Sequence, residues 1–204
     1  FAKIDTSGEI DGHPKLVTFY QPDLERALRN QAATHESVTA ATGVELLQFV
    51  DAGGAVRATV KTPDGAEHTV VAKFLVGADG ANSTVRAAIG QDFVGNTYPE
   101  DWLIVDATGV AGGFDHVEFL CDPKRPTPHM IAPGGRTRWE FMLQPGESRE
   151  EMEKDETIRR LLAPWADART LQIERKAVYR FHARSCERYA SGRVFLVGDA
   201  AHVT

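Results

Sequence analysis

The stretch that most constrains the fold is Phe74 to Arg86, which reads FLVGADGANSTVR. Its apolar start predicts a buried parallel strand, its Gly-Ala-Asp-Gly centre a tight turn, and its Ser-Thr-Val-Arg end the first turn of a helix. In open α/β sheets, ligands bind outside the carboxyl ends of the strands, where free helix amides can meet phosphate. The stretch therefore predicts a ligand site.

A second stretch with the same order of features lies at residues 193–204, RVFLVGDAAHVT. Val194 to Val197 predicts an apolar strand, and Gly198 then begins a turn whose small residues could open a helix. Ala200 and Ala201 permit the close backbone approach that a phosphate requires. The two stretches thus predict two similar turns at the ends of strands.

Asp79 and Asp199 each follow one of these strands. A carboxylate repels phosphate, but it accepts hydrogen bonds from ribose or ribityl hydroxyls, from an arginine or from turn amides. The following helix amides can bind the phosphate. Both turns therefore suit a dinucleotide. Asp is also favoured in turns and N-caps for local reasons, so either motif alone is more often scaffold than site.

Other site chemistries find little support in the sequence. Gly77 and Gly80 do not complete a Gly-x-Gly-x-x-Gly fingerprint, because Asp79 stands where a glycine is needed. No Gly-x-Ser-x-Gly elbow occurs, and the seven histidines show no paired spacing for a metal. We therefore predict no metal site and nominate no catalytic residue.

The rest of the chain predicts two further regions. A helix is expected over about Pro22 to Ala33, after a strand at Leu16 to Tyr20, with Gln21 at its start as either a simple polar residue or a ligand contact. An antiparallel meander is expected between Ser37 and Val71, as a cover for the sheet that contains Phe74 to Val76.

Beyond residue 90 the pattern predicts a second sheet. The strands expected there cover Asp101 to Val110, Phe114 to Cys121, His129 to Ala132, Arg138 to Leu143 and Leu171 to Phe181. A capping box at Ser148 and Glu151 predicts a helix that ends before Pro164. The fold class is therefore α/β, of the mixed α+β kind. Arginines in these strands could steer an anionic substrate, although exposed strand arginines are usually solvated: Arg136, Arg138, Arg175, Arg180 and Arg184.

Composition narrows the partners. A net charge of −6, without clusters of Lys and Arg, argues against nucleic acid, and no apolar run reaches the roughly 20 residues of a membrane helix. Cys121 and Cys186 form no Cys-x-x-Cys pair, which suits a reducing, cytoplasmic compartment. Because the chain starts at Phe1 and stops just after a strand and turn, we expect a fragment of a longer protein.

Two motifs together resemble those of the single-component flavoprotein aromatic hydroxylases, the group A flavin monooxygenases. Residues 77–86, GADGANSTVR, resemble the DG motif of that family, and residues 198–202, GDAAH, resemble its second flavin motif. The segment 21–25, QPDLE, is similar to the segment whose polar residue contacts the ribityl side of the flavin. Residues 121–123, 138–143 and 145–147 resemble the branch of 3-(3-hydroxyphenyl)propionate hydroxylases.

The resemblance implies a partial FAD-binding domain of the p-hydroxybenzoate-hydroxylase-like type, with a β-sheet substrate domain inserted. The implied domains are 1–90 (partial FAD-binding domain), 91–190 (substrate sheet) and 191–204 (return to the FAD-binding domain). The implied cofactor is FAD, with NADH or NADPH as co-substrate, and the implied partners are a small phenolic acid and molecular oxygen. The implied cofactor-binding residues are Gln21, Asp79, Gly198, Asp199 and Ala200.

The implied reaction is hydroxylation of a phenolic ring. The 204 residues contain only some of the sequence motifs of that family. The glycine-rich Gly-x-Gly-x-x-Gly loop is absent from them, so we expect this segment alone to bind FAD poorly and to be inactive. Two alternatives stay open: another FAD-dependent oxidoreductase, such as a reductase, dehydrogenase or halogenase, and a non-catalytic truncated module. The sequence does not name the substrate, the nicotinamide cofactor or the oligomeric state.

Overall fold

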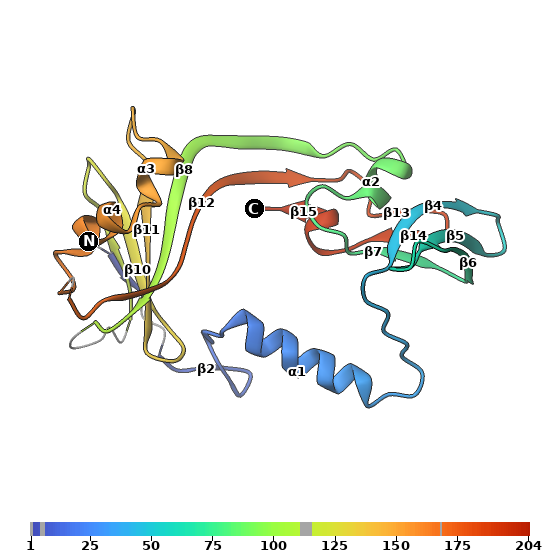
Figure 1. Cartoon of the computed structure of the whole chain (residues 1–204), viewed down its shortest axis with the longest axis horizontal. Helices are drawn as coiled ribbons and strands as arrows, with labels where there is room; N and C mark the ends of the chain where they lie inside the picture. The colour runs from blue at the N-terminus through green and yellow to red at the C-terminus, as the bar shows by residue number, and fades with distance from the viewer. Residues whose placement is uncertain (1, 5–6, 111–115, 168) are drawn as a thin grey trace. The chain divides into compact units, whose positions relative to one another are not determined.

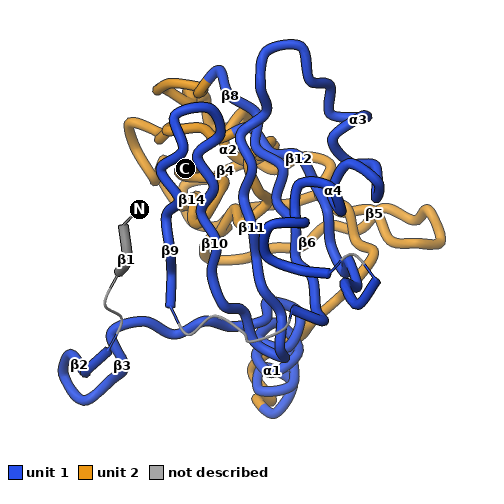
Figure 2. Tube along the Cα trace, turned by 90° about the vertical axis from the view of Figure 1, so that its left-hand side faces the viewer, with its two compact units in different colours: residues 1–34, 99–180 blue, residues 35–98, 181–204 orange. Residues whose placement is uncertain are grey.

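The computed structural model describes residues 2–4, 7–110, 116–167 and 169–204, which form a mixed α/β fold (Figure 1). The predicted α/β class is therefore confirmed. The chain divides into two compact units, residues 1–34 with 99–180 and residues 35–98 with 181–204 (Figure 2). It passes between them three times, once after Thr34 and twice within long strands, β8 (Val94–Thr108) and β12 (Gln172–Ser185). The functional domains 1–90, 91–190 and 191–204 remain a prediction.

A large sheet dominates the first unit. Its strand order is β1-β9-β10-β11-β8-β12-β15, with antiparallel pairing of β9, β10, β11 and β8. Its strands, besides β8 and β12, are β1 (Ala2–Ile4), β9 (Val117–Leu120), β10 (Thr127–Ala132), β11 (Arg136–Met142) and β15 (His202–Val203), the last of which belongs to the second unit. The strand expected from Asp101 begins earlier in the sequence, because β8 extends back to Val94.

Strand β11 shows how this sheet separates its two faces. Thr137, Trp139 and Phe141 are buried on one face, whereas Arg136 and Arg138 are half-buried on the other. This alternation is the period of two that a strand with one core face requires. Two helices, α3 (Arg149–Met152) and α4 (Asp155–Leu162), pack on the core face. The arginine face is left for other contacts.

The helix predicted between Ser148 and Pro164 is two helices. Its start is confirmed, because the Ser148 hydroxyl accepts a hydrogen bond from the Glu151 amide at 3.2 Å. The chain becomes extended at Lys154, with ψ of 135°, before α4 begins. The break allows Met152 and Ile158, both buried, to join the same apolar core. Tertiary packing thus overrides the continuous local pattern.

The N-terminal part of the first unit contains a short hairpin, β2 (Glu9–Ile10) with β3 (His13–Pro14), and helix α1 (Gln21–Ala33). The helix agrees with its prediction, one residue earlier. The strand predicted at Leu16 to Tyr20 is wrong, because these residues are irregular and exposed. Val17, Phe19 and Tyr20 line a pocket instead of belonging to a strand.

The second unit contains the predicted antiparallel meander of β4 (Glu45–Asp51), β5 (Val56–Lys61) and β6 (Glu67–Ala72). The segment 38–42 is not a strand. A second small sheet has the order β13 (Ala190–Ser191), β14 (Val194–Leu196), β7 (Leu75–Gly77). Its turns lead into α2 (Thr84–Ala88) and a 3-10 turn η1 (Gly198–Ala200). The core of this unit joins the two sheets through Val56, Leu46 and Phe49 from the meander and Val85, Val194 and Leu196 beside it.

Candidate functional site

Strands β7 and β14 bring the two glycine turns together. They pair in parallel, with Leu75 opposite Val194 and Gly77 opposite Leu196, and the Val197 amide donates to the Gly77 carbonyl at 3.0 Å. Because the strands are parallel, both turns follow the carboxyl ends of their strands and lie at the same end of the sheet. About 110 residues separate the end of the first motif from the start of the second. The sequence therefore predicts each turn, but it does not predict that the two strands pair.

The Asp79 carboxylate is committed to its own turn. One oxygen accepts from the Ser83 hydroxyl at 2.5 Å, and the other accepts from the Val85 amide at 3.1 Å. The Ser83 hydroxyl in turn accepts from the Arg86 amide and caps α2. Burial raises the pKa of Asp79, but these hydrogen bonds outweigh burial and hold the pKa below its usual value. Asp79 therefore shapes the turn, and its part in binding a cofactor remains a prediction.

Arg86 joins the two turns. One guanidinium nitrogen donates to the Ala81 carbonyl at 2.7 Å, and the other donates to the Ala200 carbonyl at 3.1 Å. The guanidinium also lies over the Phe93 ring, 4.0 Å from its centroid. The sequence predicted Arg86 only as the last residue of the motif and gave it no role. An arginine at this position could have indicated a bridge, because a guanidinium with several donors is suited to joining separate carbonyls.

The second turn presents free polar groups. Gly198 has φ of +58°, and a Cβ added there would meet no atom within 4 Å. Asp199 is exposed and has no hydrogen-bond partner among the described residues, whereas Ala200 and Ala201 are buried. The amides that open such a turn have no acceptor inside it. A hydroxyl-rich chain next to a phosphate would fit these groups.

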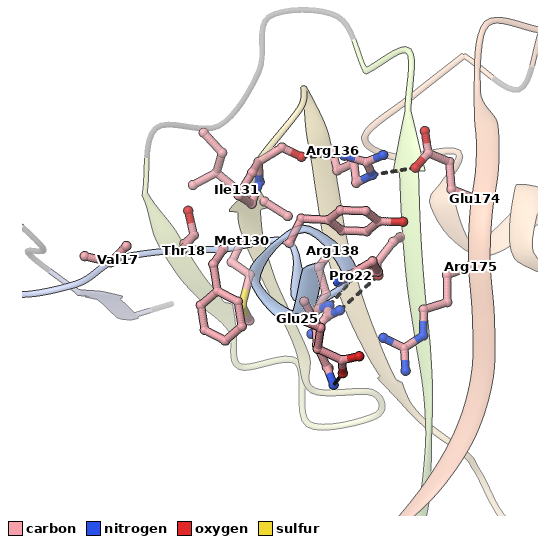
Figure 3. Close-up of a pocket in the computed structure, with 16 residues that line it drawn as sticks. Val17, Thr18, Pro22, Glu25, Met130, Ile131, Arg136, Arg138, Glu174 and Arg175 are labelled. Atoms are coloured by element: carbon pink, nitrogen blue, oxygen red, sulfur yellow. Dashed lines mark hydrogen bonds and ion pairs between the residues drawn. The ribbon is translucent and has the colours of Figure 1, made fainter. Parts of the chain in front are cut away.

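Gln21 lies in the other compact unit, at the first residue of α1. Its side-chain amide donates to a Glu25 oxygen at 3.0 Å, and it lines a pocket of about 550 Å³ (Figure 3). Because Gln21 and the two turns belong to different units, the structure brings together Asp79, Gly198, Asp199 and Ala200 but describes Gln21 separately. The role of these five residues in binding a cofactor remains a prediction.

The pocket in the first unit is bounded by the 17–25 segment and by β10, β11 and β12. Its volume is in the range of small-molecule sites. Apolar side chains, among them Val17, Met130 and Ile131, line the pocket together with arginines and carboxylates (Figure 3). Such a mixture of apolar surface and a few charged groups is typical of a pocket for an organic ligand with a polar substituent.

Two of the pocket arginines are paired with carboxylates. Arg136 donates to Glu174 at 2.5 Å and lies over the Tyr20 ring, 4.3 Å from its centroid. Arg138 binds both oxygens of Asp106, at 2.7 and 2.9 Å. This hydrogen bonding raises the pKa of Arg138 against the opposing effect of burial.

The predicted arginines therefore fall into two groups. The pocket collects Arg136, Arg138 and Arg175, whereas Arg180 pairs with Asp101 at 2.7 Å outside it. Arg184, in the second unit, donates to the Thr97 hydroxyl at 2.6 Å. Arg136 and Arg138 are thus not simply solvated strand arginines, because both are half-buried and each is paired with a carboxylate.

Metal-ligand groups and membrane-spanning helices are both missing from the part of the chain that the structure describes. Within it, no three His, Cys, Asp or Glu side chains gather as a metal-ligand group. No helix among those residues is long and apolar enough to cross a membrane. His129 is buried on the core face, with its Nε2 at 3.0 Å from a Glu118 oxygen.

Two glycine turns at the carboxyl ends of adjacent parallel strands, one of them with a carboxylate that has no partner among the described residues, form the arrangement at which α/β folds bind nucleotides. Residues 2–204 match the family model of the FAD binding domain, and the chain belongs to this family. The ligand of the family is thus FAD, and the second turn fits it: Asp199 could accept from hydroxyls, and the turn amides could meet the pyrophosphate.

Curated relatives match the whole chain. It is 35% identical over 204 residues to a 3-(3-hydroxy-phenyl)propionate/3-hydroxycinnamic acid hydroxylase of Comamonas testosteroni, covering 100% of this chain and 35% of the relative. It is 32% identical over 206 residues to the hydroxylase of the same name from Escherichia coli O139:H28, of which it covers 37%. The chain thus spans little more than a third of the length of these relatives.

Solved structures of similar proteins agree on the fold. A p-nitrophenol 4-monooxygenase from Pseudomonas putida superposes with a TM-score of 0.80 at 24% identity, covering 91% of this chain and 48% of that one. An aklavinone-11 hydroxylase, solved with FAD and aklavinone, gives a TM-score of 0.77 at 29% identity, covering 91% of this chain and 37% of that one. The predicted resemblance to FAD-dependent aromatic hydroxylases is confirmed.

Proposed function

We propose that the whole protein is an FAD-dependent, NAD(P)H-consuming monooxygenase that hydroxylates a phenolic aromatic acid such as a hydroxyphenylpropionate. The observation that carries the proposal is the parallel pairing of β7 with β14, which places both motifs at the carboxyl ends of adjacent strands. Identity to the hydroxyphenylpropionate hydroxylases over the full chain supports the substrate class. Use of NAD(P)H points to the cytoplasm, where these nucleotides are available.

In this proposal each residue has a limited task. Asp199 accepts hydrogen bonds from the ribityl chain, and the amides from Ala200 onward bind the pyrophosphate. Gly198 allows the backbone to approach, because it has no side chain, and its φ of +58° is one that glycine adopts readily. Asp79 holds the neighbouring turn, and Gln21 contacts the ribityl side. FAD, once bound, supplies the redox chemistry, while the protein supplies position and a dry environment.

The first test uses the whole protein loaded with FAD. We expect 3-(3-hydroxyphenyl)propionate to stimulate NADH or NADPH oxidation and to give a product heavier by one oxygen atom. Stimulated oxidation without such a product would favour a reductase or dehydrogenase, and a halogenated product formed with added halide would favour a halogenase. A whole protein that binds no flavin would support a non-catalytic module.

A further inference from the structure

We propose that Arg175 anchors the carboxylate of the aromatic acid in the pocket of the first unit and thereby sets the preference for acids. This inference rests on the proposed function, because it names a determinant of specificity for that reaction. Arg175 lies on β12, and Figure 3 shows its side chain extending towards the side of the pocket where Glu25 and Arg138 lie.

The charges of the pocket single out Arg175. Its other two arginines already hold carboxylates, Arg136 with Glu174 and Arg138 with Asp106. Glu25, the third carboxylate of the pocket, accepts a hydrogen bond from Gln21 and lies 4.0 Å from Arg29, which does not line the pocket. Among the described residues, Arg175 has no carboxylate within ion-pair distance. It is therefore the pocket arginine that holds no carboxylate from the described part of the protein.

The contacts of Arg175 leave room for a ligand. It donates to the Tyr179 hydroxyl, which is neutral, and its guanidinium lies 5.7 Å from the centroid of that ring. A guanidinium carries five N–H donors in a planar fork, so most of its donors remain available. Such a fork binds a carboxylate through two parallel hydrogen bonds, which a lysine ammonium does not reproduce.

An incoming carboxylate would have to compete for the other two arginines. Arg136 also donates to the Pro133 carbonyl at 2.9 Å, and Arg138 is held at both oxygens of Asp106. Displacing Asp106 would leave a buried carboxylate without its partner, which is costly, and binding at Arg136 would have to displace Glu174. Binding at Arg175 breaks no existing ion pair.

The opposite side of the pocket suits the ring of the substrate. Phe19 and Ile131 are large apolar side chains that line the pocket, yet they are 59% and 42% exposed. Covering such surface by an aromatic ring is favourable, because apolar area is removed from water. The pocket thus offers apolar contact for a ring and one free cation for an acid substituent.

The experiment compares an acid with its neutral analogue on the whole FAD-loaded protein. The variants are Arg175→Gln, Arg175→Lys and a matched control, Lys176→Gln, at an exposed cation that pairs with Asp155. The probes are 3-(3-hydroxyphenyl)propionate and 3-(3-hydroxyphenyl)propanol. Binding constants come from the change in flavin absorbance, and KM and kcat come from product formation.

For Arg175→Gln we expect a rise of about 10- to 100-fold in Kd and KM for the acid, which is the usual loss for a hydrogen-bonded ion pair. The constants for the propanol, the flavin content and the melting temperature should stay at wild-type values. Arg175→Lys should lose part of this preference, and Lys176→Gln none of it.

Equal losses for the acid and the propanol would overturn the inference, as would an unchanged Kd for both. A rise confined to the KM of NAD(P)H would also overturn it, because Arg175 would then bind phosphate. These results are distinct from failure of the proposed function, in which the wild-type protein forms no hydroxylated product from either probe.

Discussion

Two aspartates in equivalent turns have different surroundings, and this difference predicts different consequences of their loss. Asp79 accepts from Ser83 and from the Val85 amide, whereas Asp199 is exposed and has no partner among the described residues. A carboxylate with partners in the fold contributes to stability. An unpartnered carboxylate in a ligand-binding turn is available for the ligand.

Asp199→Ala should lower flavin occupancy without affecting the stability of the flavin-free protein. Removing the hydrogen-bond acceptor should cost about 1 to 3 kcal/mol of flavin binding if its partner is left buried. The measurement is the ratio of flavin to protein absorbance in the whole protein, with flavin titrated back to find Kd. Asp92→Ala, at another exposed carboxylate of the same unit, is the control. Unchanged flavin content in Asp199→Ala would remove the residue from the site.

Asp79→Ala should lower the stability of the flavin-free protein by about 1 to 2 kcal/mol, because the Ser83 hydroxyl and the Val85 amide lose their acceptor. The folded-state pKa of Asp79 is lowered, so its contribution is present above the usual carboxyl pKa and is lost as pH falls through the folded value. Urea unfolding at pH 7 and below pH 4 measures both effects. The difference between variant and wild type should shrink in acid, and a constant difference would contradict this account.

His129 predicts a second pH dependence near neutrality. Burial lowers the pKa of His129, although Glu118 partly opposes the effect and His116 adds to it. Below about pH 6.5 the histidine of the unfolded chain takes up a proton more readily than the folded one. The free energy of unfolding should therefore decrease as the pH decreases. His129→Gln should flatten this slope between pH 7 and 5, whereas His68→Gln, at an exposed histidine of β6, should leave it as in wild type. Parallel slopes in all three proteins would refute the prediction.

Gly77 controls how closely three elements of the second unit pack. It ends β7, and a Cβ added there would lie 2.7 Å from the Val85 Cβ in α2 and 3.2 Å from a Leu196 methyl in β14. Backbone strain is not involved, because the glycine is needed only for this close approach. The distance between the two turns therefore depends on the absence of a side chain at this position.

Gly77→Ala should destabilise the protein by about 1 to 3 kcal/mol, as overpacked core positions do. The matched control is Gly54→Ala, where an added Cβ meets nothing within 4 Å. Thermal melting of both variants gives the comparison, and the double variant Gly77→Ala with Val85→Ala should recover part of the loss if crowding is its cause. Equal melting temperatures for Gly77→Ala and Gly54→Ala would contradict close packing at β7.

The 204-residue chain contains two of the turns that we propose for the flavin site. Both glycine turns of the second unit are present, while no Gly-x-Gly-x-x-Gly loop occurs in the 204 residues, which span 35% of the Comamonas relative. We predict that this chain, expressed alone, retains less flavin than the whole protein, since fewer groups hold the pyrophosphate. Flavin released by denaturation and measured per mole of protein tests this. Stoichiometric flavin and a cooperative melt of the 204 residues alone would overturn the prediction.

Much of the fold followed from local patterns. Helix α1, the meander β4 to β6 and the strand-turn-helix at β7 were predictable, because period, turn residues and caps are encoded by neighbours in sequence. Patterns failed where distant residues decide. The apolar run at Leu16 to Tyr20 had the composition of a strand but lines a pocket, and the helix after Ser148 breaks at Lys154 so that Met152 and Ile158 share a core.

The sequence by itself determined the two glycine turns, their aspartates and the resemblance to FAD-dependent aromatic hydroxylases, because each is a short run of residues. Only the tertiary structure decided that β7 pairs with β14, that Arg86 bridges Ala81 to Ala200, and that Asp79 is used inside its turn. It also decided which pocket arginines already hold a carboxylate. The physical reason is the same throughout: ion pairs and strand pairing depend on which residues meet in space, and a linear pattern does not contain that information.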